Sequence, residues 1–315
     1  MQAVLDALAS LNGKPIPNLS PSEARLQPTP TDAVVTLLQN QGELLNPQAV
    51  ASILHLKIPG PIGEIPLNIY MPNGHGPFPV IVYFHGGGFV IADTKVYESS
   101  IRALVNAADA IVVSVDYHRA PEYKFPNQPN EAYAAYKWVV KNATQINGDP
   151  KRIAVAGESA GGNLAAVVSL MARDHKETMP VHQLLIYPVV DNKMGNSSYA
   201  LNANAKPLDL EMMKWFFKHY VHQQSDANNP YALPNKAKSL KGLPPTTLIT
   251  AEIDPLMSEG KDFADRLKND GVPVAYQHYE GVTHEFFGMA AVLDEAKAAQ
   301  AFVGEELKKA FTALT

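Results

Sequence analysis

The chain has 315 residues, a formal net charge of −5 at pH 7 and no cysteine. This length allows one large domain with a sizeable core, and the acidic balance without any Lys/Arg-rich block argues against nucleic acid and anionic membranes as partners. The absence of cysteine excludes disulfides, thiolate nucleophiles and cysteine-ligated metals.

The N-terminal stretch lacks the pattern of a targeting segment. It has no Lys or Arg before its apolar part and carries Asp6 inside it, which argues against a signal peptide. No apolar run approaches the ~18–20 residues that a membrane span needs. We therefore expect a cytoplasmic protein with no stable membrane association, and these patterns predict no particular oligomeric state.

The first part of the chain combines a helix pattern with many prolines. Residues 1–13 predict a short amphipathic helix. The stretch that follows is interpreted as a connector because its prolines are too many for regular structure: Pro15, Pro17, Pro21, Pro28 and Pro30. Residues 52–57 and 66–71 are strand-like and are joined by a turn-rich segment, which indicates a hairpin at a sheet edge.

Short apolar runs then alternate with helix-length patterns. Runs rich in β-branched and aromatic residues occupy 79–84, 110–116, 152–157, 183–189, 246–251 and 274–279. Helix-length patterns lie at 130–144, 258–270 and 294–311. Because continuous apolar runs suit strands that are buried on both faces, this alternation predicts an α/β fold with a mostly parallel central sheet flanked by helices.

The long interval between residues 189 and 246 breaks this rhythm. It contains a helix pattern at 208–221 that is crowded with Met213, Trp215, Phe216 and Phe217. We interpret this segment as an insertion that covers part of the molecule.

A G-x-S-x-G motif marks a candidate nucleophile. It spans residues 157–161, with Ser159 at its centre, and it follows one expected strand and begins an expected helix. A serine at such a turn is held in a strained backbone with its hydroxyl exposed, and glycines on either side remove Cβ clashes that would forbid the turn. The motif and its context predict that Ser159 is the nucleophile.

A serine hydroxyl needs a base, and the base needs an orienting acid. For this type of turn the partners are expected in the order Ser, Asp or Glu, His, each on a loop after a later strand. Asp254 follows the strand-like run at 246–251, and His284 follows the run at 274–279. Glu252, two residues before Asp254, is the alternative for the acid.

The sequence HGGGF at residues 85–89 follows a buried strand run. Glycine costs roughly 0.5–1 kcal/mol relative to alanine inside an element, so three in a row indicate a special demand on the backbone. Backbone amides that face a developing oxyanion meet that demand, since only a chain without side chains approaches so closely. We predict an oxyanion hole formed by the amides of Gly87, Gly88 and Ala160.

Together these motifs resemble the hormone-sensitive-lipase-like family of α/β-hydrolases, the HGGG-bearing carboxylesterases of bacteria. The resemblance covers the chain from about residue 60 onward, with HGGGF, GESAGGNL, YPV, NPYALP, DPL and the loop of His284 in this order. It implies Ser159 as nucleophile, His284 as general base and then acid, and Asp254 as its orienting partner. It also implies a helical cap made from 1–45 and 190–225, over a hydrolase core made from 46–189 and 226–315.

Two stretches depart from the usual family pattern. In DYHRAPEYKFP (116–126), His118 and Arg119 stand where Arg and Leu are common, and Glu158 replaces the commoner Asp beside Ser159. We expect a rearranged salt bridge near His118 and Arg119. Neither departure affects the predicted catalytic residues.

These features predict a serine carboxylesterase that hydrolyses short- to medium-chain esters in two acyl-transfer steps. Cap aromatics such as Trp215 and Phe216 would line a mostly covered apolar pocket and favour short acyl chains. The expected partner is a small-molecule ester, and no metal or other cofactor is expected, because no metal-ligand or phosphate-loop motif is present. The alternatives are a lipase that acts at lipid surfaces and a non-catalytic ligand-binding relative. An amidase or thioesterase activity also remains open.

Overall fold

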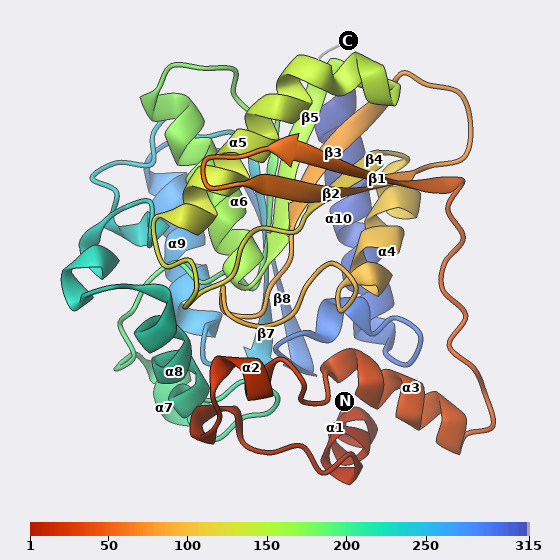
Figure 1. Cartoon of the computed structure of the whole chain (residues 1–315), viewed down its shortest axis with the longest axis vertical. Coiled ribbons are helices and arrows are strands. Elements are labelled where there is room, and N and C mark those ends of the chain that lie inside the picture. Colours follow the sequence, from red (N-terminus) through yellow and green to blue (C-terminus); the bar gives the residue numbers. More distant parts are fainter. Residues whose placement is uncertain (314–315) are drawn as a thin grey trace.

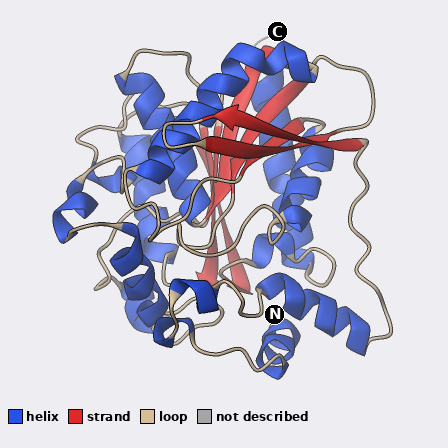
Figure 2. Cartoon of the chain, viewed as in Figure 1, coloured by secondary structure: helices blue, strands red, loops and turns tan. Residues whose placement is uncertain are grey.

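The computed structural model describes residues 1–313, which form one eight-stranded sheet between two layers of helices (Figures 1 and 2). The strand order is β1-β2-β4-β3-β5-β6-β7-β8. β2 pairs antiparallel with β1 and β4, and all the other neighbouring strands are parallel. The strands are β1 Ser52–Pro59, β2 Glu64–Met71, β3 Phe78–Phe84, β4 Ile111–Val115, β5 Gly148–Glu158, β6 Gln183–Ile186, β7 Thr246–Ile253 and β8 Val274–Thr283. The predicted α/β fold and the hairpin at the sheet edge are confirmed.

The helices divide between the two faces of the sheet (Figure 1). One face carries α4 (Glu98–Ala108) and α10 (Asp294–Thr312); the other carries α5 (Asn127–Asn142), α6 (Ala160–Asp174) and α9 (Met257–Asn269). Alternate residues of each central strand enter two separate cores, because successive side chains of a strand point to opposite faces. The apolar runs are continuous because both faces are covered.

The proline-rich N-terminal segment contains regular structure, so its interpretation as an irregular connector was wrong. Pro21 and Pro30 each occupy the first position of a helix, where the missing N–H costs no hydrogen bond. Ser20 and Thr29 cap these helices through reciprocal hydrogen bonds with acidic residues three positions later. The elements are α1 Gln2–Ser10, η1 Ile16–Asn18, α2 Pro21–Ala24 and α3 Pro30–Asn40.

The N-terminal segment and the segment that contains α7 and α8 lie at the same end of the molecule. Figure 1 shows α1, α2 and α3 beside α7 (Ser197–Leu201) and α8 (Leu210–Tyr220), at the end toward which β7 and β8 run. The helix expected at 208–221 is therefore present. The division into cap and core stays a prediction, and residues 314–315 of its last range lie outside the described residues. The short 3-10 helices are η2 Ala143–Ile146, η3 Gln224–Asn228, η4 Pro234–Lys236 and η5 Phe286–Gly288.

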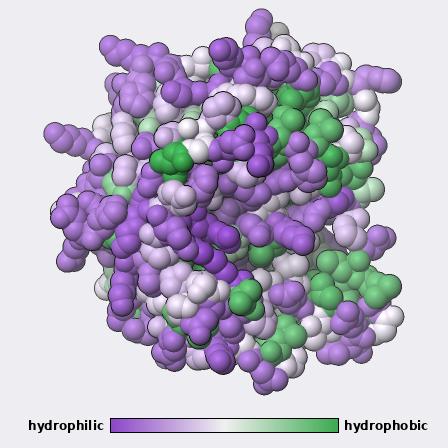
Figure 3. Space-filling model, in the orientation of Figure 1, coloured by the Kyte–Doolittle hydropathy of each residue, from purple (hydrophilic) through white to green (hydrophobic). Residues whose placement is uncertain are grey.

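The surface in Figure 3 is mostly hydrophilic, with separate hydrophobic areas over the β1–β2 hairpin and near the end of α3. Exposed large apolar side chains in these parts of the chain are Leu44, Leu54 and Leu56. Of the helices within residues 1–313, none has the combination of length and apolar character that crossing a bilayer requires.

Candidate active site

Ser159 lies at the turn between β5 and α6. Its backbone has φ 56° and ψ −118°, a sparsely populated conformation that costs a non-glycine residue roughly 1–3 kcal/mol. The turn is held by a hydrogen bond of 2.9 Å from the Ser159 amide to the carbonyl of Ile186 on β6. A Cβ atom on Gly161 would overlap the carbonyl oxygen of Phe84, so the chain needs glycine at that position.

The structure brings together the three side chains that the sequence indicated. His284 Nε2 lies 2.9 Å from Ser159 Oγ, and His284 Nδ1 lies 2.7 Å from Asp254 Oδ2. The other carboxylate oxygen of Asp254 accepts a hydrogen bond of 2.9 Å from the Leu256 amide, which fixes the orientation of the carboxylate. Asp254 and His284 follow the carboxyl ends of β7 and β8, where parallel sheets place their sites.

Glu252, the alternative acid, does not contact His284. Its side chain is directed to the last residues of β8, where Oε2 accepts a hydrogen bond of 2.7 Å from the Gly281 amide. Asp254 is fully buried, whereas Glu252 is exposed. The geometry therefore supports Asp254, and Glu252 holds the end of β8 that precedes the histidine.

Opposing effects act on the pKa of His284. Burial disfavours the imidazolium ion and lowers the pKa, but the hydrogen-bonded Asp254 carboxylate beside it raises the pKa. Glu285 and Glu158 add further negative charge, and the net result is a pKa above the ordinary value. A proton that leaves Ser159 is therefore well accommodated on His284.

Two glutamates beside this arrangement, the buried Glu158 and the partly buried Glu285, were not recognised from the sequence as members of the site. Glu158 accepts hydrogen bonds from the hydroxyls of Tyr83 (2.6 Å) and Tyr187 (2.5 Å). Glu285 accepts one from Tyr97 (2.7 Å). Burial raises the pKa of both carboxyl groups, and the negative charge of Glu285 raises the pKa of Glu158 further. The signal available in the sequence was their position directly beside Ser159 and His284.

The loop after β3 carries the predicted oxyanion amides. Gly87 and Gly88 have φ of +93° and +60°, and a Cβ on either one would overlap a neighbour, the Ile91 carbonyl and the Phe216 ring respectively. Within residues 1–313, the amides of Gly87, Gly88 and Ala160 donate no hydrogen bond, so all three are available to a ligand.

Aromatic packing fixes the start of this loop. His85 stacks on Tyr117 with ring centroids 4.3 Å apart, and its Nδ1 donates a hydrogen bond of 2.8 Å to the Gly86 carbonyl. The Tyr117 hydroxyl donates to the His85 carbonyl at 2.8 Å. The ring and the carbonyl of His85 therefore both help to fix the start of the loop.

The unusual pair His118 and Arg119 occupies two separate places. His118 Nδ1 and its amide each lie 2.7 Å from the carboxylate of the buried Glu131. Arg119 instead donates a hydrogen bond of 2.8 Å to the carbonyl of Ala92, which follows the oxyanion loop. His118 is therefore the partner of the buried acid, and the expected rearrangement of the family's salt bridge stays a prediction.

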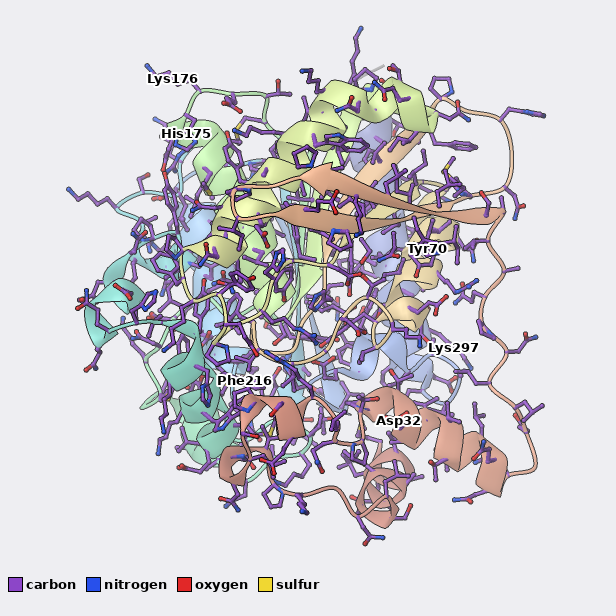
Figure 4. All side chains as sticks on the ribbon, in the orientation of Figure 1. Asp32, Tyr70, His175, Lys176, Phe216 and Lys297 are labelled. Carbon is purple, nitrogen blue, oxygen red and sulfur yellow. The ribbon has the colours of Figure 1, made fainter. Side chains whose placement is uncertain are left out.

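A cavity of about 640 Å³ contains Ser159 and His284 in its wall. Gly87 and Gly88 line it, as do residues of the N-terminal segment and of α8. Phe216 belongs to the wall and lies in the lower left part of the molecule in Figure 4, above the N-terminal segment. The expectation for Trp215 was wrong: this residue is absent from the wall, and its indole Nε1 donates a hydrogen bond of 3.2 Å to the Leu19 carbonyl. It joins α8 to the N-terminal segment.

Arg25 connects the N-terminal segment to the oxyanion loop. Its guanidinium group donates hydrogen bonds of 2.8 Å to the carbonyls of Val90 and Ala120 and pairs with Glu122 at 2.7 Å. The guanidinium fork is fixed on three partners, so the N-terminal segment is tied to the backbone just after HGGGF.

The class of the α/β-hydrolases is defined by a mostly parallel sheet, a serine at this strand-to-helix turn, and an aspartate and a histidine after later strands. A family model described as alpha/beta hydrolase fold matches residues 81–288. The chain belongs to this family, as the resemblance to hormone-sensitive-lipase-like carboxylesterases indicated, and it is a serine carboxylesterase.

Several known proteins are similar to this chain. It is 39% identical over 252 residues to the esterase LipI of Mycobacterium tuberculosis, with 78% of each chain covered. It is 37% identical over 254 residues to the carboxylesterase NlhH of the same species, with 79% of this chain and 80% of that one covered. A thermostable esterase from Pseudomonas putida ECU1011 is a close structural match, with a TM-score of 0.89, 36% identity, and 99% and 98% of the two chains covered.

Proposed function

We propose that this carboxylesterase hydrolyses esters with short to medium acyl chains through a Ser-His-Asp triad and an acyl-enzyme intermediate. The observation that supports this proposal is the hydrogen-bonded series Asp254–His284–Ser159, with both contacts of the histidine within 3.0 Å. This is the reach that a nucleophile and its base require. The cavity beside Ser159 offers room for a small ester.

In the first step, Ser159 Oγ attacks the carbonyl carbon of the ester while His284 Nε2 accepts its proton. The carbonyl oxygen becomes negative and accepts hydrogen bonds from the amides of Gly87, Gly88 and Ala160. Asp254 stabilises the imidazolium through Nδ1. The bond to the alcohol oxygen then breaks, and the alcohol leaves with the proton from Nε2.

In the second step, water attacks the acyl-enzyme and transfers one proton to His284 Nε2. The oxyanion again lies on the three amides. The bond between the acyl group and Ser159 Oγ then breaks, and Oγ recovers its proton from Nε2 as the acid is released. The residues end in the state in which they began, so no group outside the chain is consumed except water and ester.

The preference for short acyl chains is proposed from the wall of the cavity. Phe216, Met213 and Leu208 are large apolar side chains that line the cavity and are almost fully buried. They favour an apolar acyl group and limit its length. Phe216 also contacts the oxyanion loop, since no Cβ fits between it and Gly88.

The experiment is the hydrolysis of p-nitrophenyl esters from acetate to palmitate by the wild type and by Ser159→Ala. We expect the highest kcat/KM on acetate or butyrate, and a loss of activity by a factor of ~10⁴ or more in the variant. Ser169→Ala is the matched control, because Ser169 is a buried serine of α6, the helix that follows Ser159, and its hydroxyl donates a hydrogen bond of 3.1 Å to the Ala165 carbonyl of the same helix.

Three results would contradict parts of the proposal. Equal activity of Ser159→Ala and wild type would exclude Ser159 as the nucleophile. Higher activity on emulsified long-chain esters than on dissolved short-chain esters would favour a lipid-surface lipase. Binding of esters without turnover by the wild type would favour a ligand-binding role.

A further inference from the structure

Glu285 has a position that the triad mechanism does not use. It follows His284 directly, with a backbone φ of +71°, a left-handed conformation that is uncommon for a residue with a long side chain. This conformation turns the carboxylate back toward the histidine, so that Oε1 lies 3.6 Å from His284 Nε2. The side chain also lines the cavity.

Tyr97 holds the Glu285 carboxylate in place. The Tyr97 hydroxyl, at the start of α4, donates a hydrogen bond of 2.7 Å to Oε1. The second oxygen, Oε2, accepts no hydrogen bond from residues 1–313, and 17% of the side chain remains accessible. Glu285 lines the cavity, so its second carboxylate oxygen can accept a hydrogen bond from a molecule bound there.

The position beside Nε2 identifies which part of an ester lies near Glu285. Nε2 gives its proton to the leaving alcohol, so the alcohol oxygen must come within about 2.6–3.2 Å of this atom. Glu285 therefore lies next to the alcohol part of the ester. A hydroxyl group on the carbon next to the ester-bearing carbon would be within hydrogen-bond reach of a carboxylate at this position.

We propose that Glu285 is a specificity-determining residue that accepts a hydrogen bond from a hydroxyl group on the alcohol part of the substrate. The substrate class is then monoesters of diols and polyols. This inference rests on the proposed function, because it uses the route of the proton from His284 to the leaving alcohol. Tyr97 acts as the positioning residue for the carboxylate.

One more polar side chain is available to the same part of the ester. Ser99, in the first turn of α4, lines the cavity together with Tyr97 and Glu285. The neighbouring Ser100 is buried and hydrogen-bonded to Glu158. The alcohol part would thus meet polar groups of Tyr97, Ser99 and Glu285.

The test compares two esters that differ by one group, 2-hydroxyethyl butyrate and propyl butyrate. They have equal numbers of non-hydrogen atoms, with a hydroxyl in one where the other has a methyl. We expect the wild type to favour the hydroxyethyl ester in kcat/KM by about tenfold, the factor typical of one hydrogen bond to a charged group. Because the comparison is made within each variant, general damage to the active site cancels.

Three variants are measured with both esters. Glu285→Met should reduce the preference to about one, and Tyr97→Phe should reduce it partly. The Tyr97 variant keeps the inference testable if the Glu285 variant does not fold. Glu280→Met, which removes an exposed carboxylate near the end of β8, should keep the preference of the wild type.

The failure of this inference is distinguishable from the failure of the proposed function. If p-nitrophenyl butyrate hydrolysis is lost in Ser159→Ala but the preference is the same in wild type and Glu285→Met, only the role of Glu285 is overturned. A wild type that does not distinguish the two esters would also overturn it. If Ser159→Ala stays active, the mechanism itself is wrong.

Discussion

The substitution Gly87→Ala tests the oxyanion loop at its least tolerant position. Gly87 has φ +93°, and a Cβ atom there would overlap the backbone carbonyl of Ile91. The Ile91 amide donates a hydrogen bond of 2.9 Å to the Gly87 carbonyl, so the two residues are fixed against each other. The overlap cannot be relieved by turning a side chain. The loop must move, and the Gly87 amide must move with it.

The expected magnitude has two parts. The left-handed backbone conformation costs alanine about 1–2 kcal/mol, which lowers the free energy of unfolding. The displaced amide removes one donor from the oxyanion, and a loss of this kind costs ~10²–10³ in kcat, or about 2.7–4 kcal/mol. Because the donor acts on the transition state, kcat and kcat/KM should fall together while KM changes little.

The assay is the steady-state hydrolysis of p-nitrophenyl butyrate, with thermal unfolding measured on the same samples. Gly271→Ala is the matched control, since Gly271 has φ +82° but no atom within 4 Å of its would-be Cβ. It should lose a similar amount of stability and keep its kcat. If Gly87→Ala is folded and its kcat stays within about threefold of that of Gly271→Ala, the oxyanion assignment is refuted.

Three other variants test separate parts of the account. Glu285→Gln removes a negative charge that raises the pKa of His284. Because kcat/KM rises at acid pH as His284 loses its proton, the acid limb of the pH profile should move to lower pH. An acid limb at the same pH as in the wild type would contradict this. Arg25→Met should lower kcat and thermal stability, because the backbone after the oxyanion loop loses the hydrogen bond that anchors it. Glu122→Gln changes the half-exposed carboxylate that pairs with Arg25, and it should change the free energy of unfolding by less than ~1 kcal/mol. Phe216→Ala should shift the optimum of the p-nitrophenyl ester series to longer acyl chains, and an unchanged optimum would exclude this side chain as the limit.

The features that could be predicted well from the sequence are those that short stretches of consecutive residues determine. Continuous apolar runs identified the central strands because a strand buried on both faces leaves no place for polar residues. Ser159 was identifiable because its turn requires glycines at fixed spacing. Asp254 and His284 could be chosen because loops after parallel strands converge at one edge of the sheet.

The features that were missed depend on helix caps or on contacts between distant segments. The roles of Pro21 and Pro30 as first residues of helices depend on caps that a count of prolines ignores. Trp215 and Phe216 are adjacent on one helix, but only the packing against the N-terminal segment decides which one faces the cavity. The anchoring of Glu285 by Tyr97 joins positions 188 residues apart, so no local pattern shows it.

The most direct test of the central claim is to label the folded wild-type protein with diisopropyl fluorophosphate and locate the adduct by peptide mass spectrometry. The reagent phosphorylates a serine whose hydroxyl is activated by a base, which is the state proposed for Ser159 beside His284. We predict a single adduct on Ser159, formed in step with the loss of esterase activity. An adduct on a different residue, or loss of activity with Ser159 unmodified, would contradict it.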